Sequence, residues 1–295
     1  MWIVLALICA FLTGTGDALS KRLLKDSDER TVGWAKLAFT IPWLLGGLLI
    51  TGSPPLTKSF WALVALMIPL EVVATLSYLR AIRIAPLSLA VPFLAFTPLL
   101  TVFTSKIFLG EGISPLGFVG VCAVTVGAYV LQAELVAQGI LEPIRAMFRN
   151  PGIRLMLLTA MLYSVTSTLG KKAILLSSPT TFLFYYFFVE TLVLGEWIRR
   201  GSGGFRKVLP EVRSRLGTYL LAGVVLTGAL LAHATGIQRA PVAYFLSIKR
   251  LSLLVTVLYG GLLFREEAFL QRVLGTTLML AGAVLITLVG GGVIK

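Results

Sequence analysis

The sequence predicts an all-α polytopic membrane protein: ten transmembrane helices in two inverted five-helix repeats around a central cavity. Composition, ten apolar stretches and an internal repeat support this. Of the 295 residues, 57% are apolar and 13% are charged, against about 45–50% and about 25% in soluble domains. This composition excludes a soluble enzyme, a disordered chain and a disulfide scaffold. The two cysteines, Cys9 and Cys122, lie in apolar runs and predict no redox framework.

The apolar stretches are continuous and long enough to be membrane-spanning helices. A helix needs about 20 mostly apolar residues to cross a bilayer, whereas β-barrel strands are about half that length and alternate in polarity. The first stretch lacks a basic n-region and a cleavage site, which favours a first span over a signal peptide. The predicted spans are 2–20, 32–51, 59–80, 87–108, 114–133, 153–175, 180–199, 216–238, 242–264 and 269–290.

The second half of the chain repeats features of the first half in register. At an offset of 155 residues, Ala85-Pro86 recurs as Ala240-Pro241, and Glu111 recurs as Glu266. Because each half holds an odd number of spans, the second half must enter the membrane from the opposite side, as in many secondary transporters. We therefore divide the chain into a first repeat over 1–134, a connecting loop over 135–152 and a second repeat over 153–295.

These paired motifs resemble the EamA-type branch of the drug/metabolite transporter superfamily. The resemblance rests on ten short helices, on "A-P" before the fourth helix of each half, and on the acidic residue that closes that helix (Leu109-Gly110-Glu111 and Phe264-Arg265-Glu266). It covers essentially the whole chain. It implies a cavity between the two halves and transport of small metabolites by alternating access.

The distribution of basic residues predicts the orientation. Loops on the side opposite the termini hold 17 Lys and Arg, and the side that carries the termini holds 6. Because Lys and Arg favour cytoplasmic loops, the count places both termini outside, although the family is usually described with its termini inside. The expected location is the bacterial cytoplasmic (inner) membrane. The net charge of +13 therefore indicates topology and contact with anionic headgroups rather than nucleic-acid binding.

Ionisable residues inside predicted spans are the first candidates for a functional site, because their burial in a bilayer is costly. Lys249 and Arg250 lie about eight residues into the ninth span. We predict that they bind an anionic group of the substrate; the alternative is a permanent ion pair with Glu190 or Glu71. Ser252 and Thr256 share the helix face of Lys249. Thr97 and Thr101, their repeat mates, extend the predicted cavity lining.

The remaining candidates are carboxyl, imidazole, ammonium and phenol groups. Glu190 and Glu71 could carry a coupling proton or neutralise a cation, and His233 is either a proton relay or a packing residue. Lys171 is expected at a positive cavity mouth. Three tyrosines could donate hydrogen bonds in the cavity: Tyr78, Tyr163 and Tyr186.

The sequence favours a secondary active transporter for a small anionic or zwitterionic metabolite, with a proton as candidate coupling ion. The alternative is a flippase or carrier for an anionic lipid or lipid-linked phosphate. We expect no enzyme activity, cofactor, metal site or nucleic-acid partner, because one histidine and two separated cysteines form no recognisable metal-ligand set. The expected partners are a small-molecule substrate and membrane lipids.

Overall fold

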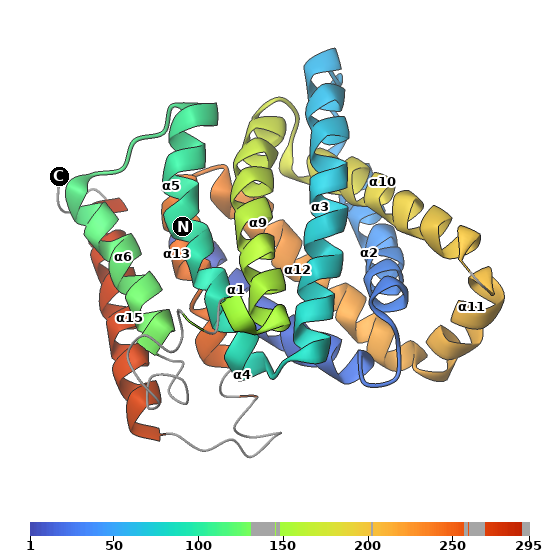
Figure 1. The fold of residues 1–295 in the computed structure, drawn as a ribbon. Coiled ribbons are helices and arrows are strands. Elements are labelled where there is room, and N and C mark those ends of the chain that lie inside the picture. Colours follow the sequence, from blue (N-terminus) through green and yellow to red (C-terminus); the bar gives the residue numbers. More distant parts are fainter. Residues whose placement is uncertain (131–144, 146–147, 202, 257–258, 260–268, 291–295) are drawn as a thin grey trace.

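The computed structural model describes residues 1–130, 145, 148–201, 203–256, 259 and 269–290. Every regular element that it describes is helical (Figure 1). The first half contains α1 (Trp2–Leu23), α2 (Glu29–Thr51), α3 (Lys58–Ile84), α4 (Leu87–Ala90), η1 (Val91–Ala95), α5 (Phe96–Leu109) and α6 (Pro115–Val130). The second half contains α9 (Pro151–Leu175), α10 (Pro179–Arg200), α11 (Gly204–Ser214), α12 (Leu216–Ile237), α13 (Val242–Lys249) and α15 (Phe269–Gly290).

Seven segments of the described chain are long and apolar enough to cross a membrane, and two shorter apolar helices, Pro115–Val130 and Gly275–Gly290, accompany them. Their outer surfaces are apolar: Leu49 is 76% exposed, Ile50 87% and Ile107 74%. An apolar exterior of this extent suits lipid rather than water. The chain is thus an integral multi-pass membrane protein. Part of the ninth predicted span, 242–264, lies outside the described residues.

The first helices of the two halves run in opposite directions. Helix α1 is parallel to α3, since Asp17 contacts Tyr78 and Lys21 contacts Ile82 one turn further along both helices. Helix α9 is antiparallel to α3: its Thr159 bonds to the carbonyl of Ala74, whereas its first turn lies against the C-terminal end of α3. We call the end where α1 begins the proximal end and the end where α1 finishes the distal end.

The fourth predicted span of each half is interrupted at the same place. We predicted one helix over 87–108, but the chain forms α4, the 3-10 helix η1 and then α5. Pro92 and Pro98 explain this difference, because proline removes a backbone donor and disfavours a continuous helix. In the second half, α13 ends at Lys249, and a turn at 250–251 precedes helical residues 252–256. At the repeat offset of 155, the end of η1 at Ala95 corresponds to Arg250.

Helices α6 and α15 pack side by side at one flank of the bundle (Figure 1). Glycines make this close approach possible. A Cβ atom on Gly282 would lie 2.7 Å from the carbonyl oxygen of Gly120, and one on Gly127 would lie 2.7 Å from that of Gly275. Small residues that bring backbones together are a common basis for helix association in membranes.

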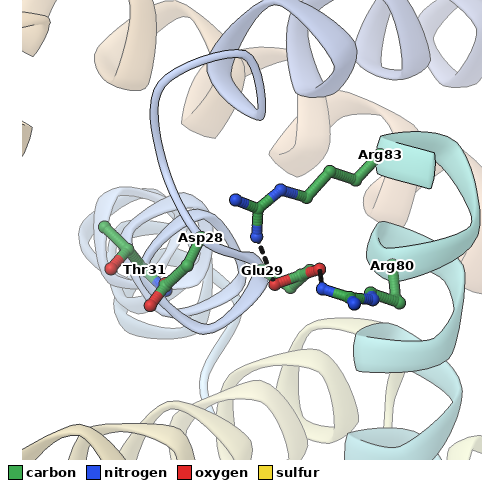
Figure 2. Close-up of polar contacts among 5 residues, drawn as sticks. All are labelled: Asp28, Glu29, Thr31, Arg80 and Arg83. Carbon is green, nitrogen blue, oxygen red and sulfur yellow. Dashed lines mark hydrogen bonds and ion pairs between the residues drawn. The ribbon is translucent and has the colours of Figure 1, made fainter.

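Polar contacts join the start of α2 to the end of α3 at the distal end (Figure 2). Asp28 caps α2 by accepting a 2.7 Å hydrogen bond from the backbone N–H of Thr31, which satisfies one of the donors left open at a helix start. The next residue, Glu29, accepts from Arg80 at 2.8 Å and from Arg83 at 2.9 Å. These contacts hold the start of α2 against the end of α3.

Candidate functional site

A central cavity of about 240 Å³ lies among the helices of both halves. Its lining comes from α1, α2, α3, α9, α10, α12 and α13, with residues 91 and 94 from η1 and residue 252 after the break in the ninth span. It is slightly smaller than the roughly 300–1,000 Å³ pockets that hold drug-sized ligands. The cavity is therefore suited to a small metabolite.

Basic side chains line the cavity: Lys36 from α2, His233 from α12, and Lys249 and Arg250 at the end of α13. Lys249 Nζ lies 3.4 Å from Nδ1 of His233, and the His233 ring packs edge-on against Phe245 with centroids 5.2 Å apart. Arg250 is buried and donates from Nη2 to Thr97 Oγ1 at 2.8 Å. Lys36 on α2 donates to Ser20 Oγ at 2.6 Å.

Two carboxyl groups line the cavity from α3 and α10. Tyr186 donates to Glu71 Oε2 at 3.1 Å, and Thr75 donates to Glu190 Oε1 at 3.0 Å. Glu71 and Thr75 lie one turn apart on α3, and Tyr186 and Glu190 lie one turn apart on α10. Each of the two hydrogen bonds joins a residue of α3 to a residue of α10. Neither glutamate forms an ion pair with any residue that the structure describes. A permanent ion pair between either glutamate and Lys249 or Arg250 is therefore not found among the described residues. We call Glu71 and Glu190 the carboxyl pair.

Two polar atoms on the cavity lining are buried and have no hydrogen-bond partner among the described residues: Nε of Arg250 and Oε2 of Glu190. One is a donor and the other is an acceptor. A buried polar group without a partner is costly, so each such atom calls for an explanation. Both are available to a polar ligand in the cavity.

Asp17 on α1 is a further buried carboxyl group that lines the cavity. It accepts hydrogen bonds from Tyr78 and, at 3.2 Å, from Thr256. Asp17 and Lys36 lie nearer the ends of their predicted spans in the sequence, so depth along the span alone does not predict that both line the cavity. The internal repeat indicates Lys36. In the first helices of the two halves, Lys21 corresponds to Lys171 at an offset of 150 residues, and at the same offset Lys36 corresponds to the predicted site residue Tyr186.

Lys171 lines the cavity and is also part of a polar clasp at the proximal end. Its Nζ forms an ion pair with Glu111 and donates to the carbonyl of Ala240 at 2.6 Å. The second oxygen of Glu111 accepts from the backbone N–H of Val242 at 2.9 Å. At the distal end the repeat mate Lys21 donates to the carbonyls of Ile82 and, at 2.8 Å, Ala85. Each lysine therefore holds the residue before the proline that starts the fourth helix.

The structure brings most predicted site residues to the cavity. Three lie behind its lining: Thr97 accepts from Arg250, Thr256 donates to Asp17, and Thr101 donates to the backbone of Thr97. Glu266 lies outside the described residues. The predicted site residues on the cavity lining are Glu71, Tyr78, Tyr163, Lys171, Tyr186, Glu190, His233, Lys249, Arg250 and Ser252.

An apolar helical bundle around a central cavity with charged side chains in its lining is typical of a membrane transporter. The EamA-like transporter family model matches residues 1–132 and 150–288, and the chain belongs to this family. The family consists of membrane transporters of the drug/metabolite transporter superfamily, not enzymes. No curated protein matches the sequence. A solved structure titled "Crystal structure of protein" is 16% identical, covers 100% of this chain and 99% of its own, and has a TM-score of 0.70; at this identity it supports the fold alone.

Proposed function

We propose that the protein is a secondary active transporter that moves a small anionic or zwitterionic metabolite across the membrane by alternating access. One observation carries the proposal: a buried guanidinium donor, Arg250 Nε, and a buried carboxyl acceptor, Glu190 Oε2, line one cavity without partners. A substrate anion would accept from Arg250 and Lys249. The cavity volume of about 240 Å³ favours a soluble metabolite over a lipid.

The proposed fold has ten spans in two inverted halves, 1–134 and 153–295. The opposite directions of α1 and α9 support this arrangement, as do the matching interruptions in the fourth helices. Discontinuous helices near the membrane midplane are common at transporter binding sites, because the break frees backbone groups to meet a substrate. In this proposal, the two halves rock around the cavity and open it to each side in turn.

The proposed coupling ion is a proton, carried by the carboxyl pair. Desolvation disfavours a buried ionised carboxylate, and Glu71 and Glu190 have hydroxyl donors but no ion-pair partner among the described residues. Substrate and proton would therefore bind on different walls of the same cavity. The proposed location is the bacterial cytoplasmic membrane with both termini outside.

Transport into proteoliposomes tests the proposal. A panel of radiolabelled organic acids, amino acids and phosphate esters is compared with flipping of fluorescent anionic lipids. Lys249→Ala is expected to reduce the transport rate at least tenfold, since a hydrogen bond to a charged group contributes about 1.5–3 kcal/mol. Lys172→Ala is the control, because Lys172 is an exposed neighbour of the clasp. Unchanged transport by Lys249→Ala would refute the proposed site, and flipping of lipids alone would replace the metabolite with a lipid.

A further inference from the structure

A second concave site lies at the distal end, and it shares no lining residue with the central cavity. It is a groove of about 420 Å³ between the end of α1 and the start of α12. We call it the headgroup groove. Its polar lining residues are Arg22, Lys25, Asp26, Ser214, Arg215 and Thr218.

The headgroup groove is positively charged. Three cations line it against one carboxylate, Asp26, which forms an ion pair with Arg215. Arg22 and Lys25 are exposed. The hydroxyl of Thr218 adds a hydrogen-bonding group to the same lining. Guanidinium, ammonium and hydroxyl groups together are the donors that proteins use to bind phosphate oxygens.

The groove continues into an apolar surface. Helix α12 runs from the distal end toward the proximal end, because Arg215 meets Asp26 and Arg239 meets Met1. Leu221, three residues after Thr218, therefore lies on the same face and deeper in the membrane. Its side chain is 51% exposed. A lipid with an anionic headgroup and acyl chains can contact both the polar groove and the apolar surface beside it. A free phosphate can contact only the polar groove.

Helix α11 places the groove at the depth of lipid headgroups. Val208 and Val212 are buried, and the Phe205 ring packs on Trp34 with centroids 5.0 Å apart. Arg206 and Lys207 are exposed on the outer surface. Basic residues that follow the end of a spanning helix are typical of the level of anionic headgroups, and α11 leads directly into the residues that line the groove.

We propose that the headgroup groove binds the phosphate of an anionic phospholipid, with an acyl chain over Leu221. Arg22, Lys25 and Arg215 bind the phosphate oxygens, and Thr218 donates a further hydrogen bond. The lipid is a bound partner and is not transported, so this site is independent of the proposed transport function.

Binding of short-chain lipids to the purified full-length protein in neutral detergent tests the site. Native mass spectrometry gives dissociation constants for dioctanoyl phosphatidylglycerol, dioctanoyl phosphatidylcholine and inorganic phosphate. Arg22→Gln/Lys25→Gln is expected to weaken phosphatidylglycerol binding about 30-fold, the effect of two lost basic contacts. Arg206→Gln/Lys207→Gln removes the same charge outside the groove, and it is expected to change binding less than about threefold.

A gain of affinity provides a second test that misfolding cannot imitate. Asp26→Asn removes the only carboxylate among the groove residues described, and it is expected to tighten phosphatidylglycerol binding about fivefold. Equal losses in the two double variants would overturn the proposal in favour of diffuse surface attraction. Equal affinity for inorganic phosphate and phosphatidylglycerol would also overturn it, because the acyl chain would then contribute nothing.

Discussion

Neither glutamate of the carboxyl pair, Glu71 or Glu190, forms an ion pair with a cation of the cavity in the part of the chain that the structure describes. Glu71 and Glu190 receive hydrogen bonds from a tyrosine and a threonine, while Arg250 bonds to Thr97. Burying separate charges costs more stability than burying a close pair. In the proposed function, a substrate anion bound to Arg250 and a proton bound to the carboxyl pair offset this cost.

Glu190→Gln is expected to abolish substrate accumulation driven by a pH gradient while leaving substrate counterflow intact. Glutamine has nearly the same shape and still accepts the hydrogen bond from Thr75, but it does not carry a proton. Proteoliposomes with an imposed pH gradient measure accumulation, and preloaded vesicles measure counterflow. Glu196→Gln is the control on the same helix, where Glu196 is exposed and pairs with Arg199 and Arg200. A Glu190→Gln protein that still accumulates substrate would exclude proton carriage by this residue.

Single-residue chemistry could be predicted from the sequence only in part. Lys249 and Arg250 stand out because they lie deep in an apolar stretch, and both line the cavity. Asp17 and Lys36 lie nearer the ends of their stretches, so depth along the sequence places them at the surface. Their burial depends on how α1 and α2 pack against the second half, and hydropathy contains no information about that packing.

At the scale of elements, most helices begin and end within a few residues of the predicted bounds. The fourth spans differ from the prediction. In the first half, a single apolar run contains α4, η1 and α5, so the helix type changes twice within it. The segment 200–215 lies between the predicted spans 180–199 and 216–238, and hydropathy predicts no helix there. Its Val208 and Val212, spaced four apart, form the buried face of α11. An 11-residue helix is too short for apolar periodicity alone to identify it reliably.

The clasp between α9 and α13 is expected to stabilise the protein more than the bridge between α2 and α3. Glu111→Ala leaves Lys171, whose side chain is 9% exposed, without its carboxylate and Val242 N–H without its acceptor. The expected loss is about 1–3 kcal/mol. Glu29→Ala is the matched control: its partners Arg80 and Arg83 are 55% and 39% exposed, so the expected loss is below about 1 kcal/mol. Unfolding in detergent measures both, and an equal loss would contradict this ranking.

Gly282→Ala is expected to weaken the contact between α6 and α15. The added Cβ would lie 2.7 Å from the carbonyl oxygen of Gly120, so the two backbones would have to separate. Gly46→Ala is the control in α2, where no atom lies within 4 Å of the new Cβ and helix propensity favours alanine by up to about 1 kcal/mol. The melting temperature should fall for Gly282→Ala and stay level or rise for Gly46→Ala. The reverse order would show that this contact tolerates a wider spacing.

At the scale of the whole molecule, the charge bias predicts that both termini face away from the cytoplasm. An alkaline phosphatase fused after Lys295, which is active only outside the cytoplasm, is expected to be active. Green fluorescent protein at the same position, exported unfolded, is expected to be dark. The opposite pattern would reverse the orientation and place the headgroup groove in the outer leaflet.

The two halves share a backbone plan but not a set of charges. Lys36 corresponds to Tyr186 and Tyr78 to His233 at the repeat offsets. Two identical inverted halves would give an outward-facing and an inward-facing state of equal free energy, because a two-fold rotation about an axis in the membrane plane would exchange the two states. Different side chains at matching positions of the two halves make the free energies of the two states unequal. The empty protein should therefore rest mainly in one facing state, and its forward and reverse transport should have different half-saturation constants.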